Sequence, residues 1–390
     1  MKLVVLNDLH PDSSPGAASI AFLLAKRAST EFETEFWFSR GEHRTATSSA
    51  SLTILKRRSR FGSHSVGKNR LLFKIWEEFF NPNSFFWFSR QLIARKASHI
   101  WVHQIGSEFP YSVILLCKLL NVKVVITLHD FGLISSGKLY PSDFYSNHDG
   151  VDEFLKSEGE FFPTYNALNV GHMIKIIRRL ILIKIVNLSD KIICISEMQA
   201  RILRLHGLRV SAVIGNGVNI CSCELNRLES NSQFEVLFAG RAIGKGLGQI
   251  IESVNRHPGA HLHLAGGVEL SDIAEKSMPE NKYTFHGMLT PEQLVNLIHS
   301  VDLVSVLSEC YDVYPTITLE SLMHKVPVVT SRTAGNFGLV VQLAPDLLIP
   351  YRQIPDLNQI QKLLSAQLLR FPKIDSVEDS WTKYRSFLIS

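Results

Sequence analysis

The stretch that decides the fold of this chain is Leu303-Val-Ser-Val-Leu-Ser-Glu-Cys-Tyr-Asp312-Val-Tyr-Pro-Thr-Ile-Thr-Leu-Glu320. It begins as a short apolar strand, passes through a polar loop and enters a helical pattern, and a second apolar strand follows at 326–330. Strands separated by helices pair in parallel. Because these apolar runs contain few polar residues, they suit strands that are buried on both faces. We therefore predict a doubly wound, parallel α/β fold.

The same alternation extends over most of the 390 residues, which exceed the usual size of one hydrophobic core. Strands are predicted at 2–6, 35–38, 52–55, 99–102, 122–128, 191–195, 212–214, 234–239, 261–265, 283–285, 303–307 and 326–330. Helices are predicted at 17–28, 247–256, 270–276, 291–299 and 315–324. We predict two Rossmann-like domains, 1–215 and 234–365, joined by a polar linker, 216–233. A helical segment, 366–390, follows, and packing back on the N-terminal domain is one arrangement for it.

Composition favours a globular enzyme, with 45% hydrophobic and 20% charged residues and a formal net charge of +5. The five cysteines form neither a zinc pattern nor a disulfide framework, which fits a reducing cytoplasm. The apolar run at 3–6 is too short for a signal peptide, and no stretch has the ~18–20 apolar residues of a spanning helix. The modest positive charge comes with no recognisable nucleic-acid module, so we expect no nucleic-acid partner.

Two acids frame the predicted helix start, with Asp312 on the loop and Glu320 inside the helix. Pro315 suits the first helical turn, and the free amide groups of Thr316 and Ile317 favour an anion such as a phosphate. Glu320 has the chemistry to accept from a ribose hydroxyl. An ordinary helix with an acid in its first turns is the alternative interpretation.

A glycine-rich loop with two cations, Gly240-Arg241-Ala-Ile-Gly-Lys245-Gly246, lies between a predicted strand and a helix. Its glycine spacing and its last glycine differ from a Walker A loop. Arg241 and Lys245 are suited to a diphosphate, and a solvated basic turn is the alternative.

Two further strand ends carry candidate residues. His129 and Asp130 follow the predicted strand 122–128, where a lone histidine is ordinarily structural. Gly16 and Ala17 open the first helix with small residues, which allows a phosphate or an acceptor to approach the backbone. No dinucleotide-binding glycine pattern follows the first strand, which argues against an NAD enzyme.

The segment from Asp312 to Glu320 resembles the E-x7-E signature of glycosyltransferase family 4, in the variant that begins with Asp. The resemblance extends to a subgroup related to colanic acid transferases and polysaccharide biosynthesis. The loop 240–246 is similar to the family's Gly-Arg and Lys-Gly pairs, and Thr-Leu-His-Asp at 127–130 is similar to its donor-side loop, which continues to Gly137. The sequence departs from the family at Pro15, where glycine is usual, and at Ser321 and Lys325, where alanine and glycine are usual.

This resemblance implies a GT-B fold, with two Rossmann-like domains facing across a cleft, and a retaining hexosyltransferase that uses a nucleotide-diphosphate sugar without metal or cofactor. By the same resemblance, each candidate residue has an implied role. His129 and Asp312 contact the donor sugar, Arg241 and Lys245 neutralise the diphosphate, Gly16, Ala17, Gly240, Pro315, Thr316 and Ile317 hold sugar and phosphate groups, Glu320 binds the ribose, and Asp130 and Gly137 lie on the acceptor side. UDP and GDP both remain as donor nucleotides. An epimerase of the same architecture and a catalytically silent sugar-nucleotide-binding protein are the alternatives.

Aromatic and basic residues interleave at 73–96, next to the basic cluster 56–70. This pattern indicates either a surface that contacts an anionic membrane or a packed core with solvated charges. The similar stretch 173–186 is interpreted as a packed helix. We expect a cytoplasmic protein. With a membrane surface, it would be peripheral, and the acceptor would be a lipid-linked glycan at the cytoplasmic face.

Overall fold

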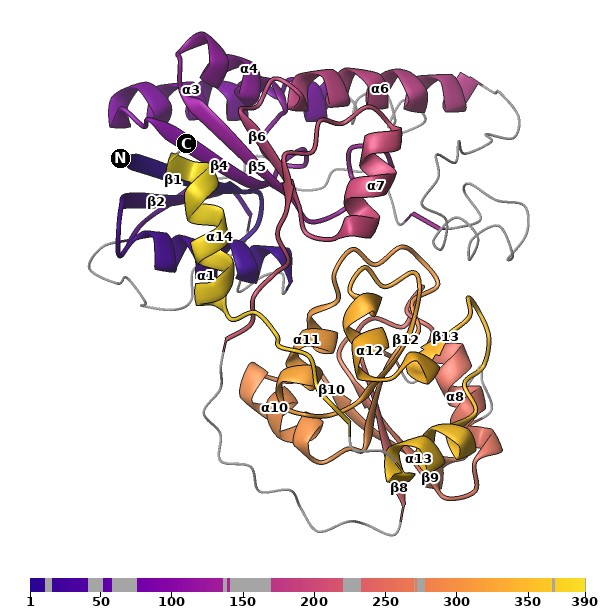
Figure 1. Ribbon diagram of the computed structural model, residues 1–390. Helices are drawn as coiled ribbons and strands as arrows, with labels where there is room; N and C mark the ends of the chain where they lie inside the picture. Colours follow the sequence, from indigo (N-terminus) through magenta and orange to yellow (C-terminus); the bar gives the residue numbers. More distant parts are fainter. Residues whose placement is uncertain are drawn as a thin grey trace. The chain divides into compact units, whose positions relative to one another are not determined.

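The computed structural model describes residues 1–10, 16–40, 52–57, 76–135, 139–140, 170–219, 233–269, 271, 278–366 and 369–389. The chain divides into two compact units (Figure 1). Unit 1 comprises Met1–Gly137, Asn166–Gly217 and Asp375–Ser390, and unit 2 comprises Lys138–Tyr165 and Val218–Ile374. The predicted domains divide the chain at 216–233 and at 366. The units differ from them in two places, because residues 375–390 belong to unit 1 and residues 138–165 to unit 2.

A parallel sheet forms the centre of unit 1, and its described strands have the order β3-β2-β1-β4-β5-β6-β7. Its strands are β1 Lys2–Asn7, β2 Glu33–Phe38, β3 Leu52–Lys56, β4 His99–Gln104, β5 Lys123–Leu128, β6 Lys191–Cys194 and β7 Ala212–Val213. All seven contain a predicted strand position. The order places β1 in the interior, so its residues Leu3 to Leu6 are fully buried.

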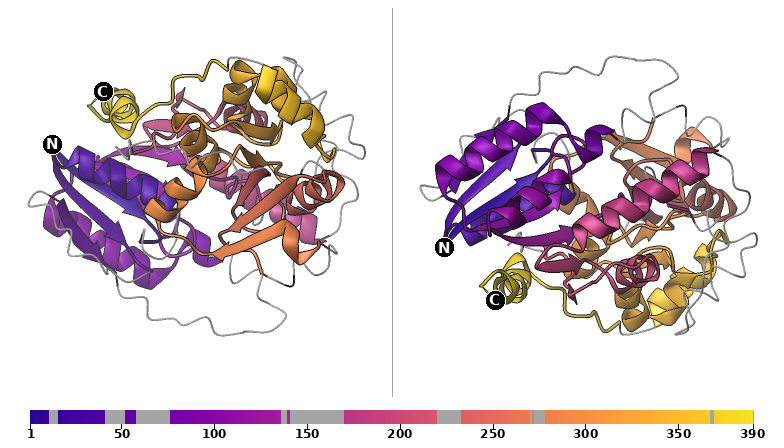
Figure 2. Two further views of the ribbon diagram at one scale, coloured as in Figure 1. Left: turned by 90° about the horizontal axis from the view of Figure 1, so that it is seen from below. Right: turned by 90° about the horizontal axis from the view of Figure 1, so that it is seen from above.

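Helices cover both faces of this sheet, as the two views of Figure 2 show for α1 and for α3, α4 and α6. They are α1 Ala17–Ala28, α3 Pro82–Arg95, α4 Ser112–Leu119, α6 Val170–Val186, α7 Glu197–Leu205 and α14 Val377–Ile389. Alternate strand residues point to opposite faces. Leu3, Val5 and Trp101 therefore share a core with α1 and α14, whereas Trp37 contacts Phe88 of α3, with ring centroids 5.7 Å apart.

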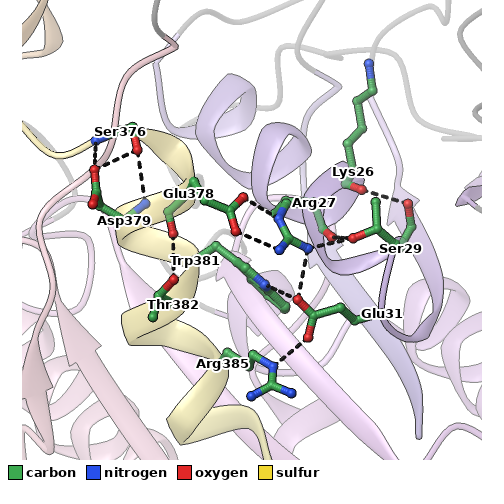
Figure 3. A network of polar contacts seen from close by, with 11 residues as sticks. Lys26, Arg27, Ser29, Glu31, Ser376, Glu378, Asp379, Trp381, Thr382 and Arg385 are labelled. Carbon is green, nitrogen blue, oxygen red and sulfur yellow. Dashed lines mark hydrogen bonds and ion pairs between the residues drawn. The ribbon is translucent and has the colours of Figure 1, made fainter.

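Helix α14 is fixed to unit 1 by both packing and polar contacts (Figure 3). The indole ring of Trp381 is buried, and its Nε1 donates to Glu31 at 2.9 Å. Arg27 of α1 pairs with both carboxylate oxygens of Glu378, with 2.6 Å between Nη2 and Oε1. The hydroxyl of Tyr384 donates to the carbonyl of Ile214 at 3.2 Å. The last helix of the chain is therefore part of the core of unit 1.

Unit 2 is built on a second parallel sheet, whose described strands have the order β10-β9-β8-β11-β12-β13. Its strands are β8 Phe234–Ala239, β9 Ala260–Ala265, β10 Tyr283–Gly287, β11 Leu303–Val306, β12 Val328–Ser331 and β13 Leu348–Ile349. Its described helices are α8 Leu247–Arg256, α10 Pro291–His299, α11 Thr316–Met323, α12 Phe337–Leu343 and α13 Leu357–Ala366, with short 3-10 turns at Glu280–Lys282 and Pro345–Leu347. The predicted helix 270–276 lies almost entirely outside the described residues.

The two parallel α/β sheets confirm the predicted fold class. No bounds were predicted for α3, α4 and α7. The helices α12 and α13 and the two-residue strand β13 were missed, and α11 was predicted to begin one residue early. Pro315 is the N-cap of that helix, with an extended backbone (φ −60°, ψ 119°), and is not its first helical residue. Within the described part of the chain, no helix is long and apolar enough to cross a membrane.

Candidate functional site

In unit 2, the loop after β8 is locked against the loop after β11. The amide of Glu309 donates to the carbonyl of Gly244 at 3.1 Å. Gly246 has a left-handed backbone (φ 79°), and a Cβ there would lie 2.1 Å from the carbonyl oxygen of Leu307. Only glycine fits this close approach. The cationic loop and the acidic loop, distant in sequence, are thus one structural element.

Lys245 and Asp312 meet at this junction. The ammonium group of Lys245 is hydrogen-bonded to Oδ2 of Asp312, and the hydroxyl of Ser308 lies 3.2 Å from the same oxygen. The side chain of Asp312 is 16% exposed and that of Lys245 is 29% exposed. A cation and a carboxylate that remain open to solvent can exchange partners with an incoming anion or hydroxyl.

The backbone fixes Asp312 on both sides. Its amide donates to the carbonyl of Thr333 at 2.9 Å, and its carbonyl accepts from Gly335 at 2.7 Å. Helix α11 starts shortly afterwards, and its first amides, at Thr316 and Ile317, have no intrahelical acceptor because of their position. The carbonyl of Pro315 accepts from the side chain of Asn336 at 2.9 Å. The start of α11 is therefore held rigidly, and no described residue accepts from the amides of Thr316 and Ile317, which leaves them to an anion.

Glu320 lies one turn further into α11, half-buried. Burial raises the pKa of its carboxyl group, and no cation among the described residues offsets this shift. A carboxylate in this state gains from any hydroxyl that donates to it. Ser321, next to it, donates to Ile317 at 2.7 Å, and Lys325 adopts a left-handed backbone (φ 62°) after the helix. The left-handed position explains why the resembling family prefers glycine there.

The ends of β8 and β9 approach each other at Gly240 and Gly266. A Cβ on Gly266 (φ 95°) would lie 2.7 Å from the carbonyl oxygen of Gly240. Arg241 follows and is exposed, with its Cγ 3.4 Å from the Cβ position of Gly267. Arg241 therefore lies at the strand ends, where an open parallel sheet binds ligands.

In unit 1, His129 follows β5 and pairs with a second histidine that the sequence analysis did not single out. Its Nε2 lies 2.8 Å from Nδ1 of His103, and the two rings are stacked with centroids 5.1 Å apart. Burial lowers the pKa of His129 to about 4 and lowers that of His103. Both rings are therefore neutral at pH 7, and one donates its N–H to the other.

Asp130 organises its own loop. Its Oδ1 accepts from the amide of Gly132 at 2.7 Å, and its carbonyl accepts from Gln199 at 3.0 Å. Arg178 of α6 donates to the carbonyl of Gly132 at 2.8 Å. These contacts fix the loop that Asp130 begins, and the acceptor-side role of Asp130 stays a prediction. Gly137 lies outside the described residues.

The first helix begins at Ala17, directly after Gly16. Gly16 has a left-handed backbone (φ 93°), and a Cβ there would meet no described atom within 4 Å. Pro15 lies outside the described residues. In the same strand-end region, Asp8 accepts from the amides of Ser107 and Phe109 at 2.8 and 2.9 Å. Burial raises its pKa to about 6, and these contacts identify it as a structural residue.

Two family models match successive parts of the chain. The model described as Glycosyltransferase Family 4 matches residues 51–221, and the model described as Glycosyl transferases group 1 matches residues 226–370. The two matches run through both units. No curated protein sequence matches the chain.

Solved structures of similar fold extend over nearly the whole chain. A crystal structure of HepE from Anabaena with UDP and glucose is 15% identical, with a TM-score of 0.65 and coverage of 100% of both chains. Sucrose-phosphate synthase from Thermosynechococcus elongatus is 16% identical, with a TM-score of 0.64 and coverage of 100% of this chain and 95% of that one. The lipopolysaccharide outer core galactosyltransferase WaaB, in its apo form, is 15% identical, with a TM-score of 0.57 and coverage of 99% and 95%. At these identities the likeness shows the fold.

Proposed function

Since this chain is a family 4 glycosyltransferase with the GT-B fold, we propose that it transfers a sugar from a nucleoside diphosphate sugar with retention of configuration. We propose a glycan or a lipid-linked glycan as the acceptor and a surface polysaccharide as the product. The complex of HepE with UDP and glucose makes uridine nucleotides the first donors to test.

The observation that carries this proposal is the junction of the two loops in unit 2. It joins a lysine, an aspartate and the start of α11 in one rigid element, with the half-buried Glu320 one turn away. A diphosphate fits the cations and the free amides, and ribose hydroxyls fit Glu320. Asp312 is then the acceptor for hydroxyl groups of the donor sugar.

In the proposed reaction, the oxygen of an acceptor hydroxyl bonds to the anomeric carbon as the bond from that carbon to the diphosphate breaks. The leaving phosphate oxygen takes the hydroxyl proton, on the same face of the sugar. Arg241 and Lys245 offset the charge that develops on the diphosphate. His129 is neutral at pH 7, so its ring is suited to hydrogen-bond a sugar hydroxyl and does not act as a general acid.

A face of unit 1 formed by α4 and α6 supports a peripheral membrane contact. Exposed apolar side chains lie along both helices, which contact each other. They are Leu115 and Leu119 on α4, with Leu120 at its end, and Ile177, Leu180, Ile181 and Leu188 on or just after α6. We call this set the α4–α6 face. Lys175 and Lys184, also exposed, flank it with positive charge.

The stretch 173–186 is a helix that packs through buried residues such as Leu182 and Val186, as interpreted from the sequence, and its other side is exposed. Leu119 is 84% exposed and Leu180 is 51% exposed. In the other candidate stretch, Phe88 is buried and Trp87 contacts Phe109 (5.9 Å between centroids), whereas Phe86 is exposed. Phe88 is therefore core, whereas Trp76 and Phe86, at 57% and 66% exposed, face solvent. The residues 58–75, with most of the basic cluster, lie outside the described residues.

A thermal-shift screen of nucleotide sugars tests the proposal, because a bound donor raises the melting temperature. We expect UDP and one UDP-sugar to stabilise the protein, and Glu320→Ala and Arg241→Ala to lose most of this shift. Arg256→Ala is the matched control, since Arg256 is an exposed arginine at the end of α8. Undiminished binding in both site variants would contradict the assigned donor site.

Product analysis separates the alternatives. A glycosyltransferase releases UDP in proportion to the sugar that appears on the acceptor. An epimerase converts the nucleotide sugar with no acceptor present, and a silent binding protein is stabilised by the donor but releases none of its sugar.

A further inference from the structure

Three neighbouring strands of unit 2 place a carboxylate and three imidazoles on one face of the sheet. Glu235 lies on β8, His261 and His263 on β9, and His286 on β10. Glu235 is the register partner of His261, and Thr284 is that of His263. Paired residues of parallel strands, and alternate residues of one strand, share a face. We propose that Glu235, His261 and His263 bind one divalent metal ion, with Zn²⁺ the best match.

The distances suit such an ion. One ligand atom from each of Glu235, His261 and His263 lies within 4.8 Å of the others. A tetrahedral zinc site with bonds of about 2.0–2.1 Å places its ligand atoms about 3.3 Å apart. Small side-chain rotations close this difference, because the sheet register already aligns the three residues. Imidazole and carboxylate are ordinary zinc ligands.

Both ring nitrogens of His263 have hydrogen-bond partners of the kind that metal-binding histidines have. Its Nε2 lies 2.9 Å from Oε2 of Glu235, and its Nδ1 lies 2.9 Å from Nε2 of His286. A metal between Nε2 and the carboxylate takes the place of the proton they share. His286 then accepts the N–H at Nδ1, which fixes the tautomer and the ring orientation, as the outer partners of zinc-bound histidines do.

His261 provides an independent observation. Its Nε2 lies 2.8 Å from the hydroxyl of Thr284, whereas its Nδ1 is buried and has no hydrogen-bond partner in the described part of the chain. A buried polar atom without a partner costs stability. When Nε2–H donates to Thr284, Nδ1 carries a lone pair that a metal satisfies.

The site is separate from the proposed donor site. Glu235 is the second residue of β8, and Arg241 follows the other end of the strand. At about 3.3 Å per residue, the two positions are roughly 20 Å apart. Strand β10 is at the edge of the sheet, and Thr284 is exposed, so an ion can enter from solvent. The metal therefore joins β8 to β9, with His286 of β10 as an outer partner, and takes no part in holding the diphosphate.

Metal binding by the whole purified chain tests the inference. After treatment with EDTA and dialysis, Zn²⁺ is titrated by calorimetry and by competition with a chromogenic chelator. We expect one Zn²⁺ per chain with micromolar or tighter affinity and a higher melting temperature. Co²⁺ should give the visible absorption of a tetrahedral site. UDP binding should be the same with and without EDTA, which keeps this test independent of the proposed function.

The variants His263→Gln and His261→Gln should each lower Zn²⁺ affinity at least tenfold. His299→Gln is the matched control, because His299 lies on α10 in ring contact with His324 (4.5 Å between centroids), outside the cluster. His286→Ala provides a second test at a partly exposed position if a strand variant fails to fold, and it should weaken binding by removing the partner of His263. Zn²⁺ binding that is absent, or equal in wild type and all three cluster variants, would overturn the inference.

Discussion

The ammonium group of Lys245 is hydrogen-bonded to the carboxylate of Asp312, across two loops that are 67 positions apart in the sequence. A nucleoside diphosphate that binds Lys245 has to compete with this carboxylate. The pair therefore predicts effects of opposite sign. Lys245→Gln should weaken UDP binding by roughly 10–150-fold, which corresponds to the free energy of one hydrogen bond to a charged group. Asp312→Asn removes the competing charge and should leave UDP affinity unchanged or higher.

Both variants should lose sugar transfer. Lys245 offsets the charge on the leaving diphosphate, and Asp312 is the proposed acceptor for hydroxyls of the donor sugar. Calorimetry with UDP and an assay of UDP release measure the two effects. Lys362→Gln is the control, since Lys362 is an exposed lysine on α13. Equal weakening of UDP binding by Lys245→Gln and Asp312→Asn would mean that the pair only fixes the loops.

Glu320 predicts a pH dependence of donor binding. Burial raises the pKa of its carboxyl group, and the ionised form is the one that accepts two hydroxyl hydrogen bonds. UDP affinity should therefore fall as the pH decreases through this raised pKa, at a higher pH than for an exposed glutamate. Glu320→Gln should abolish this dependence and weaken UDP binding at pH 8 by roughly tenfold or more.

The same variant should be more stable than wild type without ligand. A raised carboxyl pKa means that the charged form is penalised in the folded state, so above the unfolded pKa the charge lowers the free energy of unfolding. Thermal melts at pH 8 and pH 5 measure this, and the advantage of Glu320→Gln should shrink at the lower pH. A variant less stable than wild type at pH 8 would show that Glu320 has a stabilising partner.

The sequence predicted the strands well because buried parallel strands are short apolar runs, such as 234–239, whose bounds match those of β8. The helices 247–256 and 291–299 also match, since their boundaries carry glycine or proline and threonine signals. The helix Phe337–Leu343 was missed because its seven residues are too few to show a helical period. Its formation depends on the tertiary context.

The candidate site was predictable in part. Lys245 and Asp312 were singled out separately, but their contact depends on loop geometry that Gly246 and the carbonyl of Gly244 create. His103 carries no signal of its own, since it is a single histidine in a strand. Its contact with His129 arises from the pairing of β4 with β5. The His-x-His pattern at 261–263 was not predicted as a metal site, because two histidines without a cysteine or a third spaced ligand are a weak signal.

His103 should act as a positioning residue for His129. His103→Phe keeps a ring next to Trp101, whose centroid lies 4.5 Å away, but removes the hydrogen bond to His129. We expect kcat to fall about 10–100-fold with little change in UDP affinity, because misplacement of a group at the reacting sugar affects the transition state most. His103→Asn, which retains a polar atom near Nδ1, should recover part of the loss.

Steady-state kinetics from pH 5.5 to 8 complete this test. With the pKa of His129 at about 4, the wild-type rate should show no step from this residue in that range. A fall in melting temperature with unchanged kcat would assign His103 a purely structural role.

Trp381 should be the main anchor of α14 on unit 1. Its side chain is 1% exposed and contacts Trp101, with 6.3 Å between ring centroids. Trp381→Ala should lower the free energy of unfolding by about 3–5 kcal/mol, since it leaves a large cavity in a packed core. Arg385→Ala, which removes an ion pair with Glu31 at a half-exposed position, should cost less than about 1 kcal/mol. Similar losses in urea titrations of the two variants would show that the polar network of Figure 3, and not the indole ring, fixes the helix.

The α4–α6 face should bind anionic membranes. Leu119 and Leu180 are apolar side chains on two contacting helices, with Lys175 and Lys184 nearby. Burial of these leucines in the interface and attraction of the lysines to anionic headgroups act together. Co-sedimentation with vesicles of phosphatidylcholine and phosphatidylglycerol should therefore show binding that decreases with salt, and the double variant Leu119→Asp/Leu180→Asp should lose most of it. Met288→Asp, at a 72% exposed apolar residue of unit 2, adds the same charge away from this face and should bind like wild type. Two aspartates at Leu119 and Leu180 make insertion of this face into the interface unfavourable. If the double variant and the control sediment equally with vesicles, the α4–α6 face is therefore not the membrane contact.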